Sequence, residues 1–365
     1  MRLILPRLFC SALLAAPAAS PALDQPPATG PGDDPGLIVA AVGDIMLGTD
    51  YPKPRLADDD GISLLADPAP VIRAADIGIG NLEGVLMDGG EPVKSCSDPS
   101  ACYLFRSPTR YAALLADAGF DVMSLANNHA RDFGEEGRDS SMRALEAHGI
   151  RHSGREGDVA SLVVRDRSVA FVAFAPFKGA HDLLNIPLAV DIVSELSEDH
   201  DLVIVSMHAG GEAGDVRRVP FATEEYRGEN RGDVAKFARA VVDAGADLVI
   251  GHGPHVPRGM EVYRGRLIAY SLGNFATYYG IRVTGDNGLA PLLVAELASD
   301  GRFLGGRVYA YRQLRPAGPV ADASGEVIRV MERLSVMDFG DAAPVFRPDG
   351  RILPRSAGAQ SSGPD

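Results

Sequence analysis

Side chains suited to metal binding stand at or just after the ends of several apolar runs in this sequence. They are Asp44, Asn81, Glu83, Asn128, His129, His208, His252 and His255. Carboxylate, amide and imidazole groups together suit Mn, Zn or Fe, and the lack of a nearby cysteine argues against a structural zinc site. Two such ions, held about 3.5 to 4 Å apart by a bridging carboxylate, would stabilise both the attacking and the leaving oxygen of a phosphoryl or acyl transfer.

The elements around these residues predict an α/β fold. Short, continuous apolar runs alternate with amphipathic segments, which is typical of buried strands in a largely parallel sheet and of the helices between them. The predicted strands are Leu37–Val42, Val122–Ala126, Val169–Ala175, Leu202–Met207 and Leu248–Ile250, with a further apolar run at 77–80. Because ligands bind at the carboxyl ends of parallel strands, we expect the polar residues to converge there.

Helix and hairpin signals complete the predicted elements. A helix is predicted at Pro108–Ala118, with Ser107 as its cap and Gly119 after its end. Another helix is predicted at Asp233–Ala244, before Gly245. Beyond residue 259 the pattern changes to hairpins, with strands predicted at 260–263 and 267–272 and at 291–297 and 302–311.

Each ligand candidate also has an ordinary structural explanation. A histidine after a strand, such as His208, is often a capping residue, and an aspartate such as Asp44 favours turns. His252 and His255 stand on either side of Gly253-Pro254, and two imidazoles on one tight turn are harder to explain in that way. The remaining histidines lack such partners, and we expect them at the solvated surface: His148, His152, His181 and His200.

The amino-terminal residues predict an exported protein. Arg2 and Arg7 precede an apolar run too short for a permanent membrane helix, so residues 1–22 are interpreted as a signal peptide, with an uncleaved anchor as the alternative. We expect a periplasmic or cell-envelope location, with membrane association if the signal stays uncleaved. The predicted organisation is a signal peptide at 1–22, a flexible Pro/Gly-rich leader at 23–36, a folded domain at 37–345 and a disordered tail at 346–365.

Export also agrees with the cysteine content. Once the signal is removed, Cys96 and Cys102 are the remaining cysteines, and both stand in a polar loop. In an oxidising compartment they would form a local disulfide; the alternative is two unpaired loop thiols.

The net charge limits the partners. The chain has 35 Lys and Arg against 49 Asp and Glu and carries a charge of −14. This charge argues against nucleic acid as a partner, because affinity for polyphosphate comes mainly from Lys and Arg. Residues 205–275 contain nine basic and nine acidic side chains. An anionic polymer or a phosphoester can therefore approach this part of the chain without the repulsion that the total suggests.

Six motifs together resemble the capsule synthesis proteins of the CapA type, also described as poly-γ-glutamate biosynthesis proteins. The motifs are Val42–Gly48, Gly80–Gly84, Ser124–Gly134, Val205–Glu212, Gly251–Gly259 and Tyr270–Phe275. They stand in the order of that family and cover about residues 37–276. The family is similar in fold to the calcineurin-like metallophosphatases, so the resemblance implies a metallophosphatase-like four-layer α/β/β/α sandwich.

The resemblance also implies roles for single residues. The metal-ligand positions correspond to Asp44, Glu83, Asn128, His208, His252 and His255, with Glu83 as the bridging carboxylate of one or two divalent ions. His129 would protonate the leaving group. Asp132 would either orient His129 or cap a helix. The implied substrate-binding residues are Asn81, Glu212, Arg258 and Asn274.

Departures from the phosphatase pattern leave three classes of function open. Met46 stands where those phosphatases have a histidine, and Glu83 replaces an aspartate, which weakens the expected first metal position. One class is a metal-dependent hydrolase or phosphoesterase of the cell envelope. Another is a non-catalytic factor that handles an anionic polymer together with membrane proteins of capsule synthesis. The third is a metal-independent peptide epimerase, with which the predicted export disagrees.

Overall fold

The computed structural model describes residues 36–94, 102–212 and 216–355. The predicted signal peptide at 1–22 and the leader, except for Gly36, lie outside the described residues, as does Cys96. None of the helices in the described ranges is both long and apolar enough to cross a membrane.

One large mixed sheet carries the first motifs of the chain. The neighbouring strands β1, β2 and β5 run parallel, whereas β1 pairs with β17 in the antiparallel sense. Along the sheet the order is β20-β21-β18-β17-β1-β2-β5-β6, and β16 and β19 pair with β1 and β18. The strands are β1 (Leu37–Met46), β2 (Ile77–Leu82), β5 (Val122–Ser124), β6 (Arg151–Ser153), β16 (Asn274–Thr277), β17 (Leu289–Leu297), β18 (Phe303–Gln313), β19 (Pro319–Ala321), β20 (Val345–Phe346) and β21 (Arg351–Leu353).

A second sheet carries the later motifs. Its order is β14-β15-β13-β10-β8-β7, with β9 paired to β8. The strands are β7 (Ala160–Val164), β8 (Arg167–Ala175), β9 (His181–Asp182), β10 (Leu202–His208), β13 (Leu248–His252), β14 (Met260–Tyr263) and β15 (Arg266–Ala269). Two short pairs stand apart from both sheets, namely β3 (Val85–Leu86) with β4 (Arg106–Ser107) and β11 (Glu224–Tyr226) with β12 (Glu229–Gly232).

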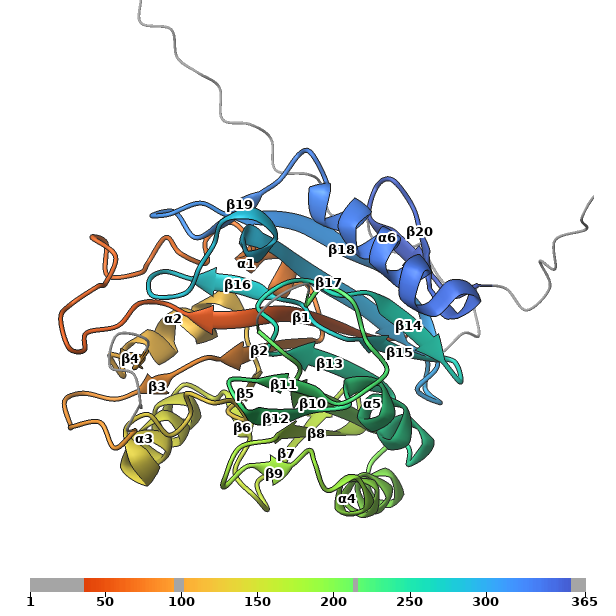
Figure 1. Cartoon of the computed structure of the whole chain (residues 1–365), viewed down its shortest axis with the longest axis horizontal. Helices are drawn as coiled ribbons and strands as arrows, with labels where there is room; N and C mark the ends of the chain where they lie inside the picture. Colours follow the sequence, from red (N-terminus) through yellow and green to blue (C-terminus); the bar gives the residue numbers. More distant parts are fainter. Residues whose placement is uncertain (1–35, 95–101, 213–215, 356–365) are drawn as a thin grey trace, which may run out of the picture. The chain divides into compact units, whose positions relative to one another are not determined.

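Three apolar cores show that the sheets and helices form four layers. One core lies between the sheets and takes residues from both. Another joins the outer face of the first sheet to α1, α2 and α3, and the last joins the outer face of the second sheet to α4 and α5 (Figure 1). The helices are α1 (Ala69–Ile72), α2 (Tyr111–Ala118), α3 (Gly134–Ala147), α4 (Ile186–Asp199), α5 (Val234–Asp243) and α6 (Glu326–Phe339), with short 3₁₀ turns η2 (Gly285–Gly288) and η3 (Gly340–Ala342). The predicted four-layer α/β/β/α arrangement is confirmed.

Most predicted elements are present, but one helix begins later than expected. Asp233 caps α5 by accepting a hydrogen bond from the Lys236 backbone, and Gly119 ends α2 with a φ of 96°. The prediction that Ser107 caps α2 is wrong. Ser107 belongs to β4, and its hydroxyl donates to the Gly48 carbonyl oxygen at 2.5 Å. Ser107 thus pairs with β3 as part of β4, although its local sequence favours a helix cap.

The carboxyl-terminal boundary also differs from the prediction. Residues 346–365 were expected to be a disordered tail, yet β20 and β21 pair with each other and β21 pairs with β18. Phe346 and Ile352 are buried in the core between the sheets. The fold therefore extends past residue 345 to at least residue 353.

Two histidines expected at the surface are buried. His152 is 7% exposed and lies between Asp158 (2.8 Å) and Glu146 (3.2 Å). His181 is 2% exposed and accepts a hydrogen bond from the Gly157 backbone (2.9 Å). Both serve to join loops to the sheets, so the solvated environment expected from their loop positions is wrong.

Two glycines allow adjacent strands to approach closely beside the polar cluster. A Cβ atom on Gly43 would lie 2.0 Å from the Gly273 carbonyl oxygen, and one on Gly251 would lie 2.1 Å from the Tyr270 carbonyl oxygen. Each glycine directly precedes a ligand candidate, Asp44 or His252. A larger residue would push the neighbouring strand, and with it the cluster, out of place.

We expect Gly43→Ala to lower the free energy of unfolding by about 1 to 3 kcal/mol, because the added methyl group meets backbone atoms that cannot rotate away. Urea unfolding measures this loss. Gly211→Ala is the matched control, since a Cβ there would make only ordinary contacts of 3.6 Å or more. Equal stability of the two variants would contradict the close approach.

Candidate functional site

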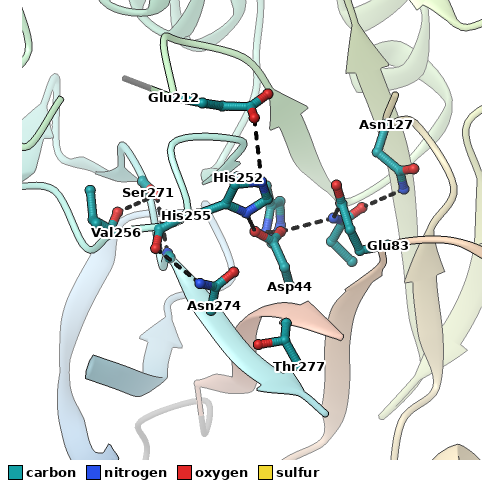
Figure 2. A network of polar contacts seen from close by, with 12 residues as sticks. Asp44, Glu83, Asn127, Glu212, His252, His255, Val256, Ser271, Asn274 and Thr277 are labelled. Atoms are coloured by element: carbon teal, nitrogen blue, oxygen red, sulfur yellow. Dashed lines mark hydrogen bonds and ion pairs between the residues drawn. The ribbon is translucent and has the colours of Figure 1, made fainter. Parts of the chain in front are cut away.

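Two carboxylates and one amide from the first sheet form the base of the site. Asp44 lies in β1, Asn81 lies opposite it in β2, and Glu83 follows β2 directly. The Asn81 amide donates to Asp44 Oδ1 at 2.9 Å and to Glu83 Oε2 at 2.6 Å. All three side chains are fully buried. The Asn81 amide therefore holds two carboxylates side by side in the interior; Figure 2 labels these carboxylates, Asp44 and Glu83.

Three histidines from the second sheet complete the cluster. His208 and His252 are the last residues of the paired strands β10 and β13, and they stand opposite each other in that pair. His208 Nδ1 lies 3.6 Å from Glu83 Oε2, and His252 Nδ1 lies 3.4 Å from Asp44 Oδ1. His255, on the loop after β13, bonds through Nδ1 to Asp44 Oδ2 at 2.8 Å. The two sheets thus deliver their polar residues to one point.

The cluster fits a metal ion because it holds buried polar atoms without hydrogen-bond partners. Single ligand atoms of Asp44, Glu83 and His208 all lie within 4.8 Å of one another. The buried atoms at the site that lack a hydrogen-bond partner among the described residues are Glu83 Oε1, Asn128 Oδ1, His208 Nε2, both ring nitrogens of His252, and Asn274 Oδ1. Leaving such atoms unsatisfied costs about 1 to 3 kcal/mol each, whereas a divalent cation would satisfy several together.

The two buried carboxylates differ in their affinity for protons. Burial raises the pKa of Glu83, and the charge of Asp44 adds to this effect, so that the pKa reaches about 8. Burial also opposes ionisation of Asp44, but its interactions with His252 and His255 outweigh this and hold the pKa of Asp44 well below its usual range. One negative charge is thus stable without metal, and the second is not.

Two histidines of the cluster, His208 and His255, also have pKa values shifted in opposite directions. Burial lowers the pKa of His208 well below its usual value, so this imidazole is neutral and can offer a lone pair to a metal. Burial also opposes protonation of His255, but the hydrogen bond to Asp44 and the nearby carboxylate charges outweigh it and raise the pKa to about 9. Without metal, protonated His255 neutralises Asp44.

His129 and Asp132 form a hydrogen-bonded pair beside the cluster. His129 Nδ1 lies 2.7 Å from Asp132 Oδ2, and Asp132 also accepts from the Phe105 backbone and contacts Lys94 Nζ at 2.9 Å. Burial lowers the pKa of His129 although Asp132 opposes this. The N-cap residue of α3 is Phe133, so Asp132 orients His129 rather than capping the helix.

Neighbouring asparagines have separate functions in this region. Asn128, a ligand candidate, lines the adjoining cavity with His129, and its Oδ1 atom is one of the unpartnered atoms. Asn127 donates to Asn81 Oδ1 at 3.1 Å and accepts from the His129 backbone at 3.0 Å. Asn127 therefore connects the base of the site to His129, a function that a run of two asparagines did not reveal.

Two predicted substrate-binding asparagines hold the site together instead of facing a substrate. Asn81 is fully buried and bonded to the two carboxylates. The Asn274 amide group donates to the carbonyl oxygens of His255, Arg282 and Asn287 at 3.1 to 3.2 Å. His255 has a φ of +57°, a conformation that needs such support. For Asn81 the predicted contact with substrate is wrong, because its amide is already occupied; the NH2 group of Asn274 is occupied too, whereas its Oδ1 atom has no partner among the described residues.

Arg258 is likewise occupied. Its guanidinium is fully buried and bonded in bidentate fashion to Glu224 at 2.8 and 2.6 Å. It also donates to the Val216 carbonyl oxygen. The prediction that Arg258 binds an anionic substrate is therefore wrong, because Glu224 of β11 neutralises it. Glu212 does line the cavity, 3.8 Å from His255 Nε2, and is paired with Arg231 at 2.7 Å.

A cavity of about 560 Å³ opens beside the cluster. His129, Asn128 and His255 line this cavity, as does Arg231, which lies between the acidic side chains of Glu212 and Glu229. Other lining residues, not recognised from the sequence, include Lys94, Tyr103, Phe105, Phe177, Tyr226, Arg227 and Arg282. They lie outside the motifs, on hairpins and loops that only the tertiary fold brings here.

The cysteine prediction falls partly outside the described residues. Cys102 is disulfide-bonded. Its predicted partner, Cys96, lies in the segment 95–101, which the structure does not describe. The bonded state of Cys102 removes unpaired loop thiols as the explanation for this cysteine.

The sequence is similar to known capsule proteins. A family model described as bacterial capsule synthesis protein PGA_cap matches residues 38–279. The PGA biosynthesis protein CapA of Bacillus subtilis (strain 168) is 28% identical over 276 residues, which cover 70% of this chain and 67% of that protein. The capsule biosynthesis protein CapA of Bacillus anthracis is 27% identical over 274 residues, which cover 69% of this chain and 62% of that protein. The chain thus spans about two thirds of the length of these relatives.

Solved structures of low sequence identity are also similar. The 5'-nucleotidase precursor from Thermus thermophilus gives a TM-score of 0.42 at 13% identity and covers 81% of this chain and 58% of that chain. A purple acid phosphatase from yellow lupin (Lupinus luteus) seeds gives 0.38 at 8% identity, with coverage of 76% and 52%. Family membership follows from the sequence match alone, which covers well over half of the chain. The chain belongs to the bacterial capsule synthesis protein PGA_cap family.

Proposed function

We propose that this protein is a metal-dependent hydrolase that acts on an anionic substrate during assembly of a capsule or of poly-γ-glutamate. The observation that carries the proposal is the set of buried, unpartnered ligand atoms from both sheets, directly beside the His129–Asp132 pair. A purely structural cluster would leave too many polar atoms unsatisfied. The family and the names of the two CapA relatives supply the biological setting.

The residues that would hold the cation are Asp44, Glu83, Asn128, His208, His252 and His255. When bound, a divalent cation such as Mn, Zn or Fe supplies Lewis-acid polarisation and activates water near neutral pH. Asn81 holds the carboxylates of Glu83 and Asp44 side by side, so both would be available to hold the cation. Met46 does not take part, because it is buried against Phe105 and Ile281.

The protein's own residues would orient the substrate and move a proton. His129 lines the cavity, and its Nδ1 atom is held by Asp132, so Nε2 is the atom that would donate a proton to the leaving group. The Phe105 ring packs against the imidazole with centroids 4.3 Å apart and fixes its orientation. Lys94, near the same pair, adds a positive charge on the side where an anionic group would bind.

Export and partners are part of the proposal. The signal peptide expected at residues 1–22 would deliver the domain to the periplasm or cell envelope, where capsule polymers are assembled. The substrate would be a phosphoester or an anionic polymer, and membrane proteins of capsule synthesis would be its neighbours.

Metal content and turnover test the proposal together. Purified protein is analysed by inductively coupled plasma mass spectrometry and assayed with bis(p-nitrophenyl) phosphate and with poly-γ-glutamate, before and after treatment with chelator. We expect bound metal, turnover of one substrate class and loss of turnover on chelation. Protein that stays folded and inactive after reloading with each of Mn, Zn and Fe would refute the hydrolase and favour a polymer-handling factor.

Asp132→Asn should lower kcat by about 10- to 100-fold, because an uncharged partner orients His129 less strongly. Asp132 raises the pKa of His129 against the effect of burial, so its loss should move the basic limb of the pH–rate profile to lower pH. Lys94→Met should move that limb to higher pH, because the charge of Lys94 lowers the same pKa. Shifts of equal sign in the two variants would contradict the role of His129 as proton donor.

A further inference from the structure

A second cavity adjoins the one that contains His129 and His255. The two have volumes of about 560 and about 270 Å³, and both open to solvent. They share Lys94, Asn128 and Phe177 as lining residues. Because they share these residues, the two cavities are treated as the adjoining halves of one groove, called here the long groove, and Asn128 lines both halves. A small phosphoester would need only the larger half, next to His255.

The larger half carries uncompensated positive charge at its rim. Arg227, on the turn between β11 and β12, stacks on Tyr226, with its guanidinium carbon 5.3 Å from the ring centroid. Arg282, on the loop after β16, donates to the Thr284 hydroxyl at 2.8 Å. Both are exposed, and neither forms an ion pair with another residue that the structure describes. Arg227 and Arg282, which stand on two different loops, are therefore available to an anionic ligand.

The two acidic side chains of the larger half share one buried arginine. Glu212 and Glu229 are its acidic lining residues within the described ranges. Arg231 lies between them, at 2.7 Å from Glu212 and 2.9 Å from Glu229. Arg231 is 3% exposed and packs on the Phe177 ring, whereas the Glu229 side chain is 60% exposed. Basic side chains that line this half therefore outnumber the acidic ones, with Lys94, Arg227, Arg231 and Arg282 against Glu212 and Glu229.

The smaller half is basic as well. Among the described residues that line it, none is acidic, and four are basic: Lys94, Arg131, Arg138 and Lys178. Arg131 and Arg138 share Glu135, whereas Lys178 is exposed and has no ion-pair partner within the described ranges. A ligand confined to the larger half would leave Lys178 without a function. In a chain with a net charge of −14, positive charge on both sides of Asn128 needs an explanation.

We propose that the long groove binds a linear polyanion across the reactive centre, so that repeat units lie on both sides of the bond that is cut. The inference rests on the proposed hydrolase function and specifies how its substrate is held. Cleavage would add one water to an internal bond, with hydroxyl going to one fragment and hydrogen to the other. Two shorter chains would result, each keeping its anionic groups. The shared chemistry is one carboxylate or phosphate per repeat.

Binding as a function of chain length tests this inference. Labelled poly-γ-glutamate, from the dimer to long chains, and inorganic polyphosphate of matched lengths are titrated into the full-length protein by fluorescence anisotropy. Three charge reversals are compared: Lys178→Glu in the smaller half, Arg227→Glu in the larger half, and Lys236→Glu on α5 as an exposed control outside the groove. Which polymer binds more tightly distinguishes carboxylate from phosphate as the preferred anion.

Affinity is expected to rise with length until the chain fills both halves. Lys178→Glu and Arg227→Glu should each weaken long-chain binding about five- to tenfold. The control should stay within about twofold, and Lys178→Glu should leave dimer binding unchanged. An affinity that stops rising at the dimer, or a Lys178→Glu variant that behaves like the control, would overturn the inference. Length-dependent binding without turnover would refute the hydrolase proposal alone, whereas turnover of small phosphoesters without length dependence would refute the long groove alone.

Discussion

His208→Ala is expected to abolish turnover and to weaken metal binding by at least about 100-fold. His208 is fully buried at the end of β10, and its Nε2 atom has no partner among the described residues. One of its ring nitrogens lies within 4.8 Å of a carboxylate oxygen of Asp44 and of Glu83, so the substitution removes one of these three candidate ligands. Metal content after dialysis, measured by mass spectrometry, and turnover are read in parallel.

Loss of metal from His208→Ala must be distinguished from loss of the fold. In chelator we expect its unfolding free energy to stay within about 2 kcal/mol of the parent, because the small cavity created is offset by removal of an unsatisfied polar atom. His200→Ala, directly after α4, is the matched control, since within the described residues the His200 ring bonds to the Ser161 hydroxyl and the Leu196 carbonyl oxygen. A His208→Ala protein with unchanged metal content would show that the ligand assignment is wrong.

The metal-free protein is expected to lose about 2 to 5 kcal/mol of stability between pH 6.5 and pH 9, at about 1.4 kcal/mol for each pKa unit. The folded-state pKa of Glu83 is about 8, against 4.5 without perturbation, so the folded state binds a proton that the unfolded state releases. The pKa of His255, about 9 against 6.5, acts in the same direction. Stability conferred by both groups is thus present at low pH and lost as the pH rises.

Urea unfolding in chelator at several pH values measures this slope. Glu83→Gln should make the slope of stability against pH smaller, because an amide cannot release a proton. Glu332→Gln, on the exposed face of α6, should leave the slope unchanged. Added divalent cation should stabilise the parent most at high pH, where it replaces the lost protons. A stability that rises from pH 6.5 to pH 9, or a Glu83→Gln slope equal to that of the parent, would contradict the buried proton on Glu83.

The ligand cluster could be predicted from sequence because its residues stand at strand ends. Asp44, His208 and His252 follow continuous apolar runs, and the edge of a sheet brings such residues together. The strand pattern alone did not predict that two sheets, and not one, would meet at this cluster. That prediction depended on the family resemblance.

Other residues depend on partners distant in sequence. Arg258 stands inside a motif, but nothing around it reveals that Glu224, 34 positions away on a hairpin, neutralises it. Ser107 has the local signature of a helix cap, yet strand pairing at β4 prevails over that preference. His152 and His181 were misplaced for the same reason, because the carboxylates and backbone groups that bury them come from other elements.

The division of the candidate ligands between the two sheets would give a bound cation a place in folding as well as in the proposed catalysis. Asp44 and Glu83 come from the first sheet, and His208 and His252 come from the second, so a bound ion would tie the two halves of the sandwich together as a disulfide ties two loops. No short stretch of the chain contains the whole set, because the ligand candidates extend from residue 44 to residue 255. On the proposed ligand assignment, metal loading would therefore follow the formation of both sheets. If the chain is exported as proposed, and in an unfolded state, the ion would have to be acquired in the compartment where the protein works.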